Sequence, residues 1–340
     1  MDFKKLVSRY RQFGGFQLVI EYAKIGVLWP AVKAGMRCVV RRQSFKQIYP
    51  AVLKKVEPIL QNRYLPVLQS KKEEVRGKNL EHKRSKIIWF CWLQGMKLAP
   101  ELVLVCYKSL KRHLPDREII FIDAENWNDY IELPEYVVRK WEKGRIPAAN
   151  FSDMLRLELL IKYGGTWIDS TVLCTGLNDN HNENEKLSRI SELENKAKQY
   201  LDADLFLFQY TPEGTTKGIS ISNWFITSCT NNEVLMVLRD MLYAYWKDYD
   251  CTLDYYIFHL FFEMVARGYP KQVGAMPYGC SQKSIALMKH WNEKFDQGQW
   301  DRLVSRVAFH KLSYRVPENV RRNKGNYYNY ILNQGLRELN

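Results

Sequence analysis

Two consecutive glycines, Gly164 and Gly165, separate a helical pattern from a strand pattern. The preceding stretch FSDMLRLELLIKY (151–163) is predicted to be a helix, with Ser152 as its N-cap and Gly164 as its left-handed stop. The following stretch TWIDSTVL is predicted to be a strand, because bulky and β-branched residues run up to a single carboxylate, Asp169. A helix, a glycine turn and a strand in direct succession indicate an α/β chain.

The same alternation extends over most of the chain. Two apolar runs, at 86–93 and 118–123, are predicted to be buried strands on either side of a helix at 99–113, which makes a βαβ unit. Later elements are expected in this order: a polar loop and helix at 178–202, strands at 204–210 and 219–228, and helices at 231–247 and 253–266.

Residues 1–80 are predicted to form a basic, amphipathic helical extension. Apolar residues recur at helical spacing in 16–29, a second helix is expected after Pro30, and a third at 47–68 is expected to be interrupted by prolines. The charged stretch 69–85 is interpreted as a linker.

The positive charge of the chain is concentrated in this extension. Residues 1–84 contain 19 Lys and Arg against 6 Asp and Glu, a net of +13 out of the total of +14. The remainder is nearly neutral, which argues against a nucleic-acid groove and against nucleic acid as a partner. Three alternatives stay open for residues 1–70: contact with an anionic membrane, contact with a partner subunit, or packing on the main domain with a solvated charged face.

Cysteine usage and the N-terminus indicate a cytoplasmic protein. The seven cysteines are scattered without a Cys-x-x-Cys pair or a Cys/His cluster, which predicts neither a zinc site nor a disulfide framework. The apolar stretch GGFQLVIEYAKIGVLWPAV contains charges and a proline and is too short to span a bilayer. We expect a cytoplasmic location, with a peripheral position on the inner face of the cell membrane as the alternative.

The strand after the glycines contains half of an Asp-x-Asp pair. Because side chains alternate along a strand, Trp167, Asp169 and Thr171 are expected on one face. Two carboxylates at that spacing can hold one hard cation, but Thr171 supplies only a neutral hydroxyl. A cation here would need further ligands from elsewhere in the fold or from substrate phosphates.

The preceding helix adds a second charged pair. Asp153 and Arg156 lie on one helical face, where the carboxylate can accept from a sugar hydroxyl and the guanidinium can bind phosphate. We expect these two side chains and Asp169 to surround one crevice. The alternative is an internal ion pair of the helix.

Several ordered blocks of the chain resemble a known enzyme family. NFSDMLRLELLIKYGGTWIDSTVLCTG is similar to the S-D-x-x-R…Y-G-G-x-[YW]-x-D signature of the glycosyltransferases that include initiating α-1,6-mannosyltransferases and the glucosylating clostridial toxins. The stretch that begins KIIWFCWLQG, the stretch ISNWFITS and the stretch HKLSYR resemble further blocks, and the bacterial capsular polysaccharide synthesis branch is the most similar. The resemblance covers about 85–315.

The resemblance implies a GT-A-like fold, which is a Rossmann-type mixed α/β sheet flanked by helices, here with the N-terminal helical extension. It makes 85–315 the glycosyltransferase domain and 316–340 a C-terminal tail. It implies a nucleoside diphosphate sugar as donor, with a UDP-sugar favoured, and Mn²⁺ or Mg²⁺ as cofactor. Thr171 departs from this pattern, because it stands in place of the second Asp that would complete a two-carboxylate metal site.

The resemblance also assigns expected roles to individual residues. Those for nucleotide-sugar binding are Trp92, Gln94, Asp153, Arg156, Asp169 and Lys311, with Trp92 near the base. Those for metal binding are Asp169, Thr171 and His310. Catalysis is expected from Asp169 and Asp254, and acceptor binding from Trp224 and Asp254.

Four of these residues also have a structural alternative. Trp92 and Trp224 can be core residues, His310 can be a structural histidine, and Asp254 can cap the helix that follows it.

The sequence as a whole therefore predicts a glycosyltransferase that acts on a hydroxyl of a capsular or O-antigen-like polysaccharide intermediate, lipid-linked or free. Retention of configuration and divalent-metal assistance are expected from the resemblance. The alternative is a non-catalytic nucleotide-sugar-binding or scaffold protein of polysaccharide assembly. A phosphoryl-transfer enzyme is disfavoured, because G-x-x-x-x-G-K-[ST] and G-x-G-x-x-G are absent from the sequence.

Overall fold

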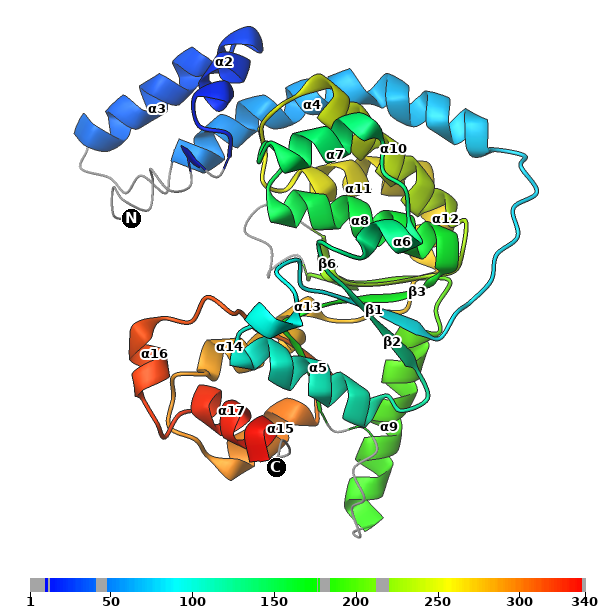
Figure 1. Cartoon of the computed structure of the whole chain (residues 1–340), viewed down its shortest axis with the longest axis vertical. Coiled ribbons are helices and arrows are strands. Elements are labelled where there is room, and N and C mark those ends of the chain that lie inside the picture. Colours follow the sequence, from blue (N-terminus) through cyan, green and yellow to red (C-terminus); the bar gives the residue numbers. More distant parts are fainter. Residues whose placement is uncertain are drawn as a thin grey trace. The chain divides into compact units, whose positions relative to one another are not determined.

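The computed structural model describes residues 10–11, 13–40, 48–175, 177, 184–211 and 220–337 (Figure 1). The chain divides into two compact units, each built from separate stretches of sequence. Unit 1 comprises Met1–Leu80, Ile131–Glu158 and Glu233–Lys271, and unit 2 comprises Glu81–Tyr130, Leu159–Asn232 and Gln272–Asn340. The helix α8 (Ala148–Tyr163) passes from unit 1 into unit 2.

Unit 2 contains a five-stranded mixed sheet in the order β2-β1-β3-β6-β5. The strands are β1 (Ile87–Cys91), β2 (Glu118–Ile122), β3 (Gly165–Asp169), β5 (Leu205–Gln209) and β6 (Ile221–Ser228). The first three are parallel, and α5 (Glu101–His113) connects β1 to β2 as the predicted βαβ unit requires. The β6 strand pairs antiparallel with β3 and with β5. The predicted mixed sheet with flanking helices and N-terminal helices is confirmed.

The predicted single strand TWIDSTVL is two strands in two different sheets. The first, β3, ends at Asp169, and Ser170 and Thr171 form a turn. The second, β4 (Val172–Cys174), pairs antiparallel with β7 (Phe309–Lys311). The prediction of one continuous strand through Asp169 and Thr171 is therefore wrong, although both side chains contact the ammonium of Lys311.

The junction between α8 and β3 depends on its two glycines. Gly164 has φ +68° and its N–H donates to the carbonyl of Leu160 at 2.9 Å, which confirms it as the helix stop. Gly165 has φ +89°, and a Cβ there would lie 2.4 Å from the carbonyl oxygen of Ile87. Only glycine fits where β3 begins against β1.

The predicted N-cap of α8 is wrong. The helix begins at Ala148, so Ser152 lies inside it, and its hydroxyl donates to the carbonyl of Ala149 at 2.8 Å. A serine inside a helix can satisfy its hydroxyl in this way on an earlier carbonyl.

The core of unit 2 is rich in aromatic residues. Phe206 and Phe208 of β5 and Phe225 of β6 are fully buried and pack edge to face on one another. The helix α9 (Asn184–Leu201) contributes Leu193 and Tyr200 to the same core, which confirms the helix expected within 178–202; residues 178–183 lie outside the described part.

A second apolar cluster of unit 2 involves the C-terminal segment. The helices α16 (Glu318–Arg322) and α17 (Tyr327–Arg337) lie within the predicted tail, and Tyr327 and Ile331 are buried against Leu102 of α5.

The remaining short helices are η2 (Met96–Leu98), α6 (Trp127–Tyr130), α12 (Pro270–Gly274), α13 (Ser281–Ser284), α14 (Ala286–His290) and α15 (Gln297–Val304).

Unit 1 is helical. Besides the first part of α8 it contains α2 (Phe16–Lys24), α3 (Leu28–Val40), α4 (Ile48–Val75), α7 (Glu135–Glu142), α10 (Glu233–Asp248) and α11 (Ile257–Gly268) (Figure 1). None of the described helices combines the length and the apolar character that crossing a bilayer requires.

The N-terminal helices differ from the prediction in two boundaries. Helix α3 begins at Leu28 rather than after Pro30, which sits in the first turn where a missing N–H is tolerated. Helix α4 continues through Pro58 and Pro66 to Val75, so the first part of the predicted linker, 69–75, is helical. One side of α4 is buried against α10 and α11, and this packing offsets the hydrogen bonds lost at the two prolines. The buried residues recur every four positions: Val52, Val56, Leu60, Tyr64 and Leu68.

Candidate functional site

The carboxyl ends of three parallel strands meet at one edge of the unit 2 sheet. Cys91 of β1 pairs with Ile122 of β2 on one side and with Asp169 of β3 on the other. The next residue after β1, Trp92, donates its backbone N–H to the carbonyl of Ile122 at 3.0 Å, which keeps it at this edge. In open α/β sheets, ligands bind in the crevice outside the carboxyl ends of the strands.

Asp169 and Lys311 form the most distinctive pair at this edge. The ammonium of Lys311 lies 2.7 Å from Oδ2 of Asp169 and 2.8 Å from the hydroxyl oxygen of Thr171. The other carboxylate oxygen of Asp169 accepts from the indole N–H of Trp167 at 2.9 Å. The side chains of Lys311 and Asp169 are 22% and 26% exposed, so a ligand can reach both.

The β4–β7 pairing explains how a residue late in the chain reaches Asp169. Lys311 is the register partner of Val172, which directly follows the turn, and the N–H of Leu312 donates to the carbonyl of Thr171 at 2.9 Å. The same ammonium also affects the pKa of the buried thiol of Cys106 in α5. Burial raises its pKa to about 12, and the charge of Lys311 partly opposes that rise. Lys311 is therefore a fixed cation at the end of β3.

The residues at this edge do not suit a divalent metal. Asp169 is the one carboxylate of the predicted metal set, and the ammonium of Lys311 lies where a cation bridging Asp169 and Thr171 would have to sit. A metal ion there would face a positive charge instead of a second carboxylate. Within the described part of the chain, no group of three or more His, Cys, Asp or Glu side chains is arranged to hold a metal ion.

His310 is turned away from this pair. It precedes Lys311 on β7, and consecutive residues of a strand point to opposite faces. Its side chain is buried, and Nε2 lies 2.9 Å from the hydroxyl of Thr175. Burial lowers the pKa of His310 to about 4, so the imidazole is neutral at pH 7. This is the environment of a structural histidine, and its metal role stays a prediction.

An aromatic pair borders the same edge. Trp92 packs on the core of unit 2, and its ring meets that of Tyr314 edge to face, with centroids 5.1 Å apart. Among the described residues, the buried indole N–H of Trp92 has no acceptor, so a bound ligand could supply one. Tyr314 is 40% exposed and lies under the guanidinium of Arg315. Gln94, two residues after Trp92, is exposed.

Two further residues at this edge, Asp123 and Tyr314, are not in the predicted set of site residues. Asp123 follows β2, accepts from the backbone N–H of Glu125 and Asn126, and has Oδ2 3.9 Å from where a Cβ on Gly95 would lie. An acidic residue directly after a strand parallel to β1 and β3 is the signal that could have indicated it. Tyr314 lies in the resembling block HKLSYR, but its place at this edge depends on the β4–β7 pairing.

The family model for "Capsular polysaccharide synthesis protein" matches residues 37–331, which include every residue of this edge. The chain belongs to the capsular polysaccharide synthesis protein family. Among solved structures, the chain is similar to "PaToxG Glycosyltransferase" at 12% sequence identity and a TM-score of 0.35, over 82% of this chain and 97% of that chain. No curated protein matches the chain.

Three predicted site residues of this family member lie in unit 1. Asp153 and Arg156 form an ion pair of 3.1 Å with side chains 8% and 5% exposed, and Arg156 also donates to the hydroxyl of Ser152 at 3.0 Å. Burial lowers the pKa of His259 to about 3, with the charge of Arg156 as the second cause. The internal ion pair is thus present, and action of these residues on the ligand of Asp169 stays a prediction.

Asp254, the third, is buried just before α11 and accepts from the N–H of Tyr256 at 2.8 Å. Its side chain therefore organises the turn that leads into the helix. Trp224, in unit 2, is buried on β6 with its ring stacked on Phe208 at 4.6 Å, which is the position of a core residue. Acceptor roles for both stay predictions.

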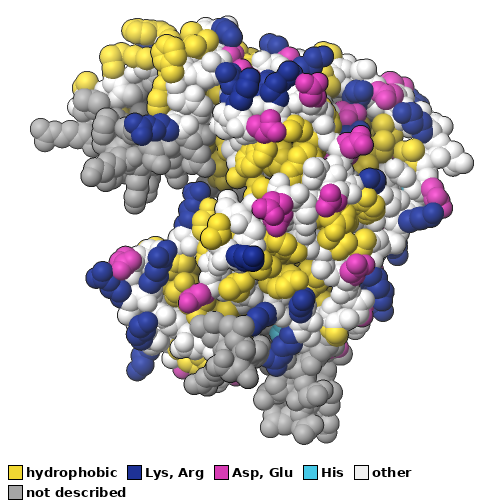
Figure 2. Space-filling model, in the orientation of Figure 1, with side chains coloured by type: hydrophobic (Ala, Val, Ile, Leu, Met, Phe, Trp, Pro, Cys, Tyr) yellow, Lys and Arg dark blue, Asp and Glu magenta, His cyan; other side chains and the backbone are white. Residues whose placement is uncertain are grey.

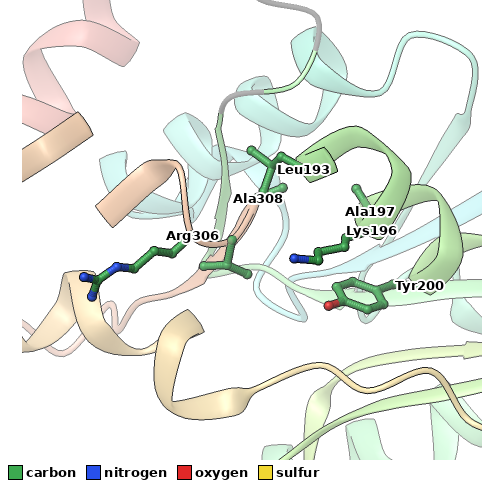
Figure 3. Close-up of a pocket in the computed structure, with 7 residues that line it drawn as sticks. Leu193, Lys196, Ala197, Tyr200, Arg306 and Ala308 are labelled. Carbon is green, nitrogen blue, oxygen red and sulfur yellow. The ribbon is translucent and has the colours of Figure 1, made fainter. Parts of the chain in front are cut away.

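A small pocket of unit 2 is separate from the predicted set. It lies between α9 and the segment before β7, as Figure 3 shows, and none of its lining residues is a predicted site residue. Its lining residues are Leu193, Lys196, Ala197, Tyr200, Arg306, Val307 and Ala308. Lys196 is already paired with Glu192, so we assign the pocket no part in the reaction.

Proposed function

We propose that this protein is a glycosyltransferase. It transfers a sugar from a nucleoside diphosphate sugar to a hydroxyl of a capsular or O-antigen-like polysaccharide intermediate. The donor that we favour is a UDP-sugar. The observation that carries the proposal is the cluster of Lys311, Asp169 and Thr171 at the carboxyl edge of parallel strands. The membership in the capsular polysaccharide synthesis family supports the choice of a glycan product.

Lys311 suits the charge that develops on the donor as its glycosidic bond breaks. The leaving nucleoside diphosphate gains negative charge, and a fixed cation stabilises it without reorganisation. An ammonium has three N–H donors, and the described contacts direct two of them to Asp169 and Thr171. A third can reach a phosphate oxygen while Asp169 keeps the side chain in place.

We further propose that Lys311 supplies the positive charge that a divalent metal supplies in related enzymes. Its ion pair with Asp169 takes the carboxylate that would otherwise bind the metal, and the described residues contain no group of three or more His, Cys, Asp or Glu side chains that could hold one. Reliance on Mn²⁺ or Mg²⁺, the expectation from the resemblance, is the alternative outcome of the test below.

We assign the remaining roles of the proposed reaction to other residues of the predicted set and to Tyr314. Trp92, whose indole N–H has no acceptor among the described residues, and Tyr314 suit the nucleoside, and Gln94 follows on the same segment. We assign Asp153 and Arg156 to the ribose or donor sugar and Asp254 to the acceptor. We propose retention, with the acceptor hydroxyl attacking from the face that the diphosphate leaves, through an oxocarbenium-like transition state.

The decisive experiment is a donor panel. The full chain is incubated with individual nucleotide sugars, with and without extracted lipid-linked glycan, in Mn²⁺, in Mg²⁺ or in chelator, and free nucleoside diphosphate is measured. We expect release from one donor that persists in chelator and is abolished by Asp169→Asn. Release from no donor under any condition would refute the transferase, and release only with metal would refute the role of Lys311 as the sole cation.

A non-catalytic nucleotide-sugar-binding or scaffold role is the second candidate. It is favoured by the fact that both carboxylate oxygens of Asp169 already have partners within the chain. This role predicts donor binding in calorimetry without nucleoside diphosphate release, which the panel would separate from turnover.

A further inference from the structure

Helix α3 exposes a continuous stripe of large apolar side chains. Trp29, Val32, Met36 and Val40 are 68%, 42%, 47% and 82% exposed. At the helical repeat these four fall within about 80° of arc, so they form one narrow band along the helix. On the neighbouring helix α2, Phe16 is 74% exposed, and Figure 2 shows hydrophobic side chains gathered over these two helices.

The opposite side of α3 is already packed. Cys38, which lies about 180° around the helix from Trp29, is 4% exposed, and Val27 just before the helix is 1% exposed. Helix α3 packs on both α2 and α4 within unit 1. The exposed stripe is therefore a second apolar face, additional to the one that folding uses, and such faces mark interaction sites.

Positive charge borders the stripe. Lys33 and Arg37 are exposed and follow the apolar band on one side, about 40° and 80° around the helix from Trp29. Helix α3 has no acidic residue, and residues 1–47 contain ten Lys and Arg against two Asp and Glu. One of those two, Glu21, is buried and paired with Lys24. In the described helices α2 and α3 the surface is thus apolar with a cationic edge, and Glu21 is their one acidic residue.

We propose that α2 and α3 form a docking surface for an anionic lipid bilayer. An apolar band bordered by Lys and Arg is the pattern of a helix that lies in the membrane interface, where the band enters the acyl boundary and the cations meet headgroup phosphates. A tryptophan at one end suits the same interface. Helix α3 would lie along the surface, since none of the described helices can span a bilayer.

This surface is independent of the sugar donor and of the chemistry at Asp169. Its consequence for the proposed transferase is location, because docking would hold the enzyme where lipid-linked glycans are presented. A weak contact is sufficient for that purpose, since the acceptor is then confined to the same surface.

The test is co-sedimentation of the full chain with lipid vesicles. Vesicles of phosphatidylcholine alone are compared with vesicles containing about a third phosphatidylglycerol, at low and at physiological salt. We expect at least about tenfold stronger binding to the anionic vesicles, weakened by salt. The double variant Val32→Glu/Met36→Glu should lose about tenfold or more of that binding, because it places two carboxylates in the band.

Two further variants make the result specific. Lys33→Glu/Arg37→Glu should remove the preference for anionic vesicles while leaving the apolar band intact. Leu98→Glu, which charges a comparably exposed leucine of unit 2 (75% exposed), should bind as the unaltered chain does. Circular dichroism melting of each variant verifies that the fold is kept.

Three results would overturn the proposal. The first is that the unaltered chain does not bind anionic vesicles, and the second is that Leu98→Glu loses as much vesicle binding as Val32→Glu/Met36→Glu. The third is a dimer in sedimentation velocity that Val32→Glu/Met36→Glu dissociates, which would make the face an interface between two copies. Nucleoside diphosphate release without lipid is measured in parallel. Loss of vesicle binding with unchanged nucleoside diphosphate release would bear only on the proposed membrane surface. Absence of nucleoside diphosphate release would bear only on the proposed transferase.

Discussion

The ammonium of Lys311 lies 2.7 Å from a carboxylate oxygen of Asp169, although the two residues are 142 positions apart in the chain. The same ammonium contacts Thr171, the residue that stands where a second carboxylate would complete an Asp-x-Asp pair. The loss of that carboxylate and the presence of the lysine are therefore one structural feature. A single negative charge and a single positive charge balance at the end of β3, and the cation is built into the chain.

Replacement of Lys311 by Met should remove the cation while keeping most of the side chain's length. We expect kcat for nucleoside diphosphate release to fall by about 10²–10³, the cost of losing one preorganised group at the developing charge. Steady-state kinetics in chelator measures the change. Lys324→Met, at an exposed lysine of the same unit, is the matched control and should leave kcat unchanged. An active Lys311→Met enzyme in chelator would contradict the proposed role.

The double variant Lys311→Ala/Thr171→Asp should convert the site to metal dependence. Removing the ammonium frees the carboxylate of Asp169, and the carboxylate introduced at position 171 supplies the missing second ligand for a hard cation. We expect activity that is absent in chelator and partly restored by Mn²⁺, whereas Lys311→Ala alone should recover less. If Mn²⁺ restores both variants equally, Thr171 does not occupy the cation position.

The parts of the fold that local pattern determines could be predicted from the sequence. The β1–α5–β2 unit and the stop at Gly164 are examples, because strand and helix periodicity and a left-handed glycine are encoded within a few residues. The turn at Ser170 and Thr171 could not be predicted, since an apolar, β-branched run is equally consistent with one strand or two. Tertiary pairing of β4 with β7 decides between them.

The candidate site shows the same division. The motif identified Asp169 and its missing partner, and the resemblance pointed to Lys311, but the direct contact between them depends on a register that no local signal reveals. Similarly, the prolines in α4 predicted an interruption. The helix continues because its buried side packs on α10 and α11, which is information held elsewhere in the chain.

His310 should make the stability of unit 2 depend on pH. Its pKa is about 4 in the folded protein against 6.5 when unfolded, so the unfolded state binds more protons between these values. The difference in pKa corresponds to about 3 kcal/mol in the free energy of unfolding. This contribution of His310 to stability is complete above pH 6.5 and is lost as the pH falls toward 4. Between about pH 7.5 and about pH 5, urea unfolding should show a loss about 2 kcal/mol larger for the unaltered chain than for His310→Gln. Parallel pH profiles for the two proteins would refute this assignment; His259 titrates in both and cancels.

Gly165→Ala should be strongly destabilising because of close contact as well as backbone strain. The residue has φ +89°, and the added Cβ would lie 2.4 Å from the carbonyl oxygen of Ile87, so β1 and β3 would have to separate. We expect a loss of about 3 kcal/mol or more in the free energy of unfolding. Gly95→Ala is the matched control, since it has φ +77° in the same unit but its Cβ would meet no atom closer than 3.9 Å, and it should cost only about 1 kcal/mol. Equal losses in the two variants would show that the left-handed backbone alone, and not the approach of β1, requires glycine at the start of β3.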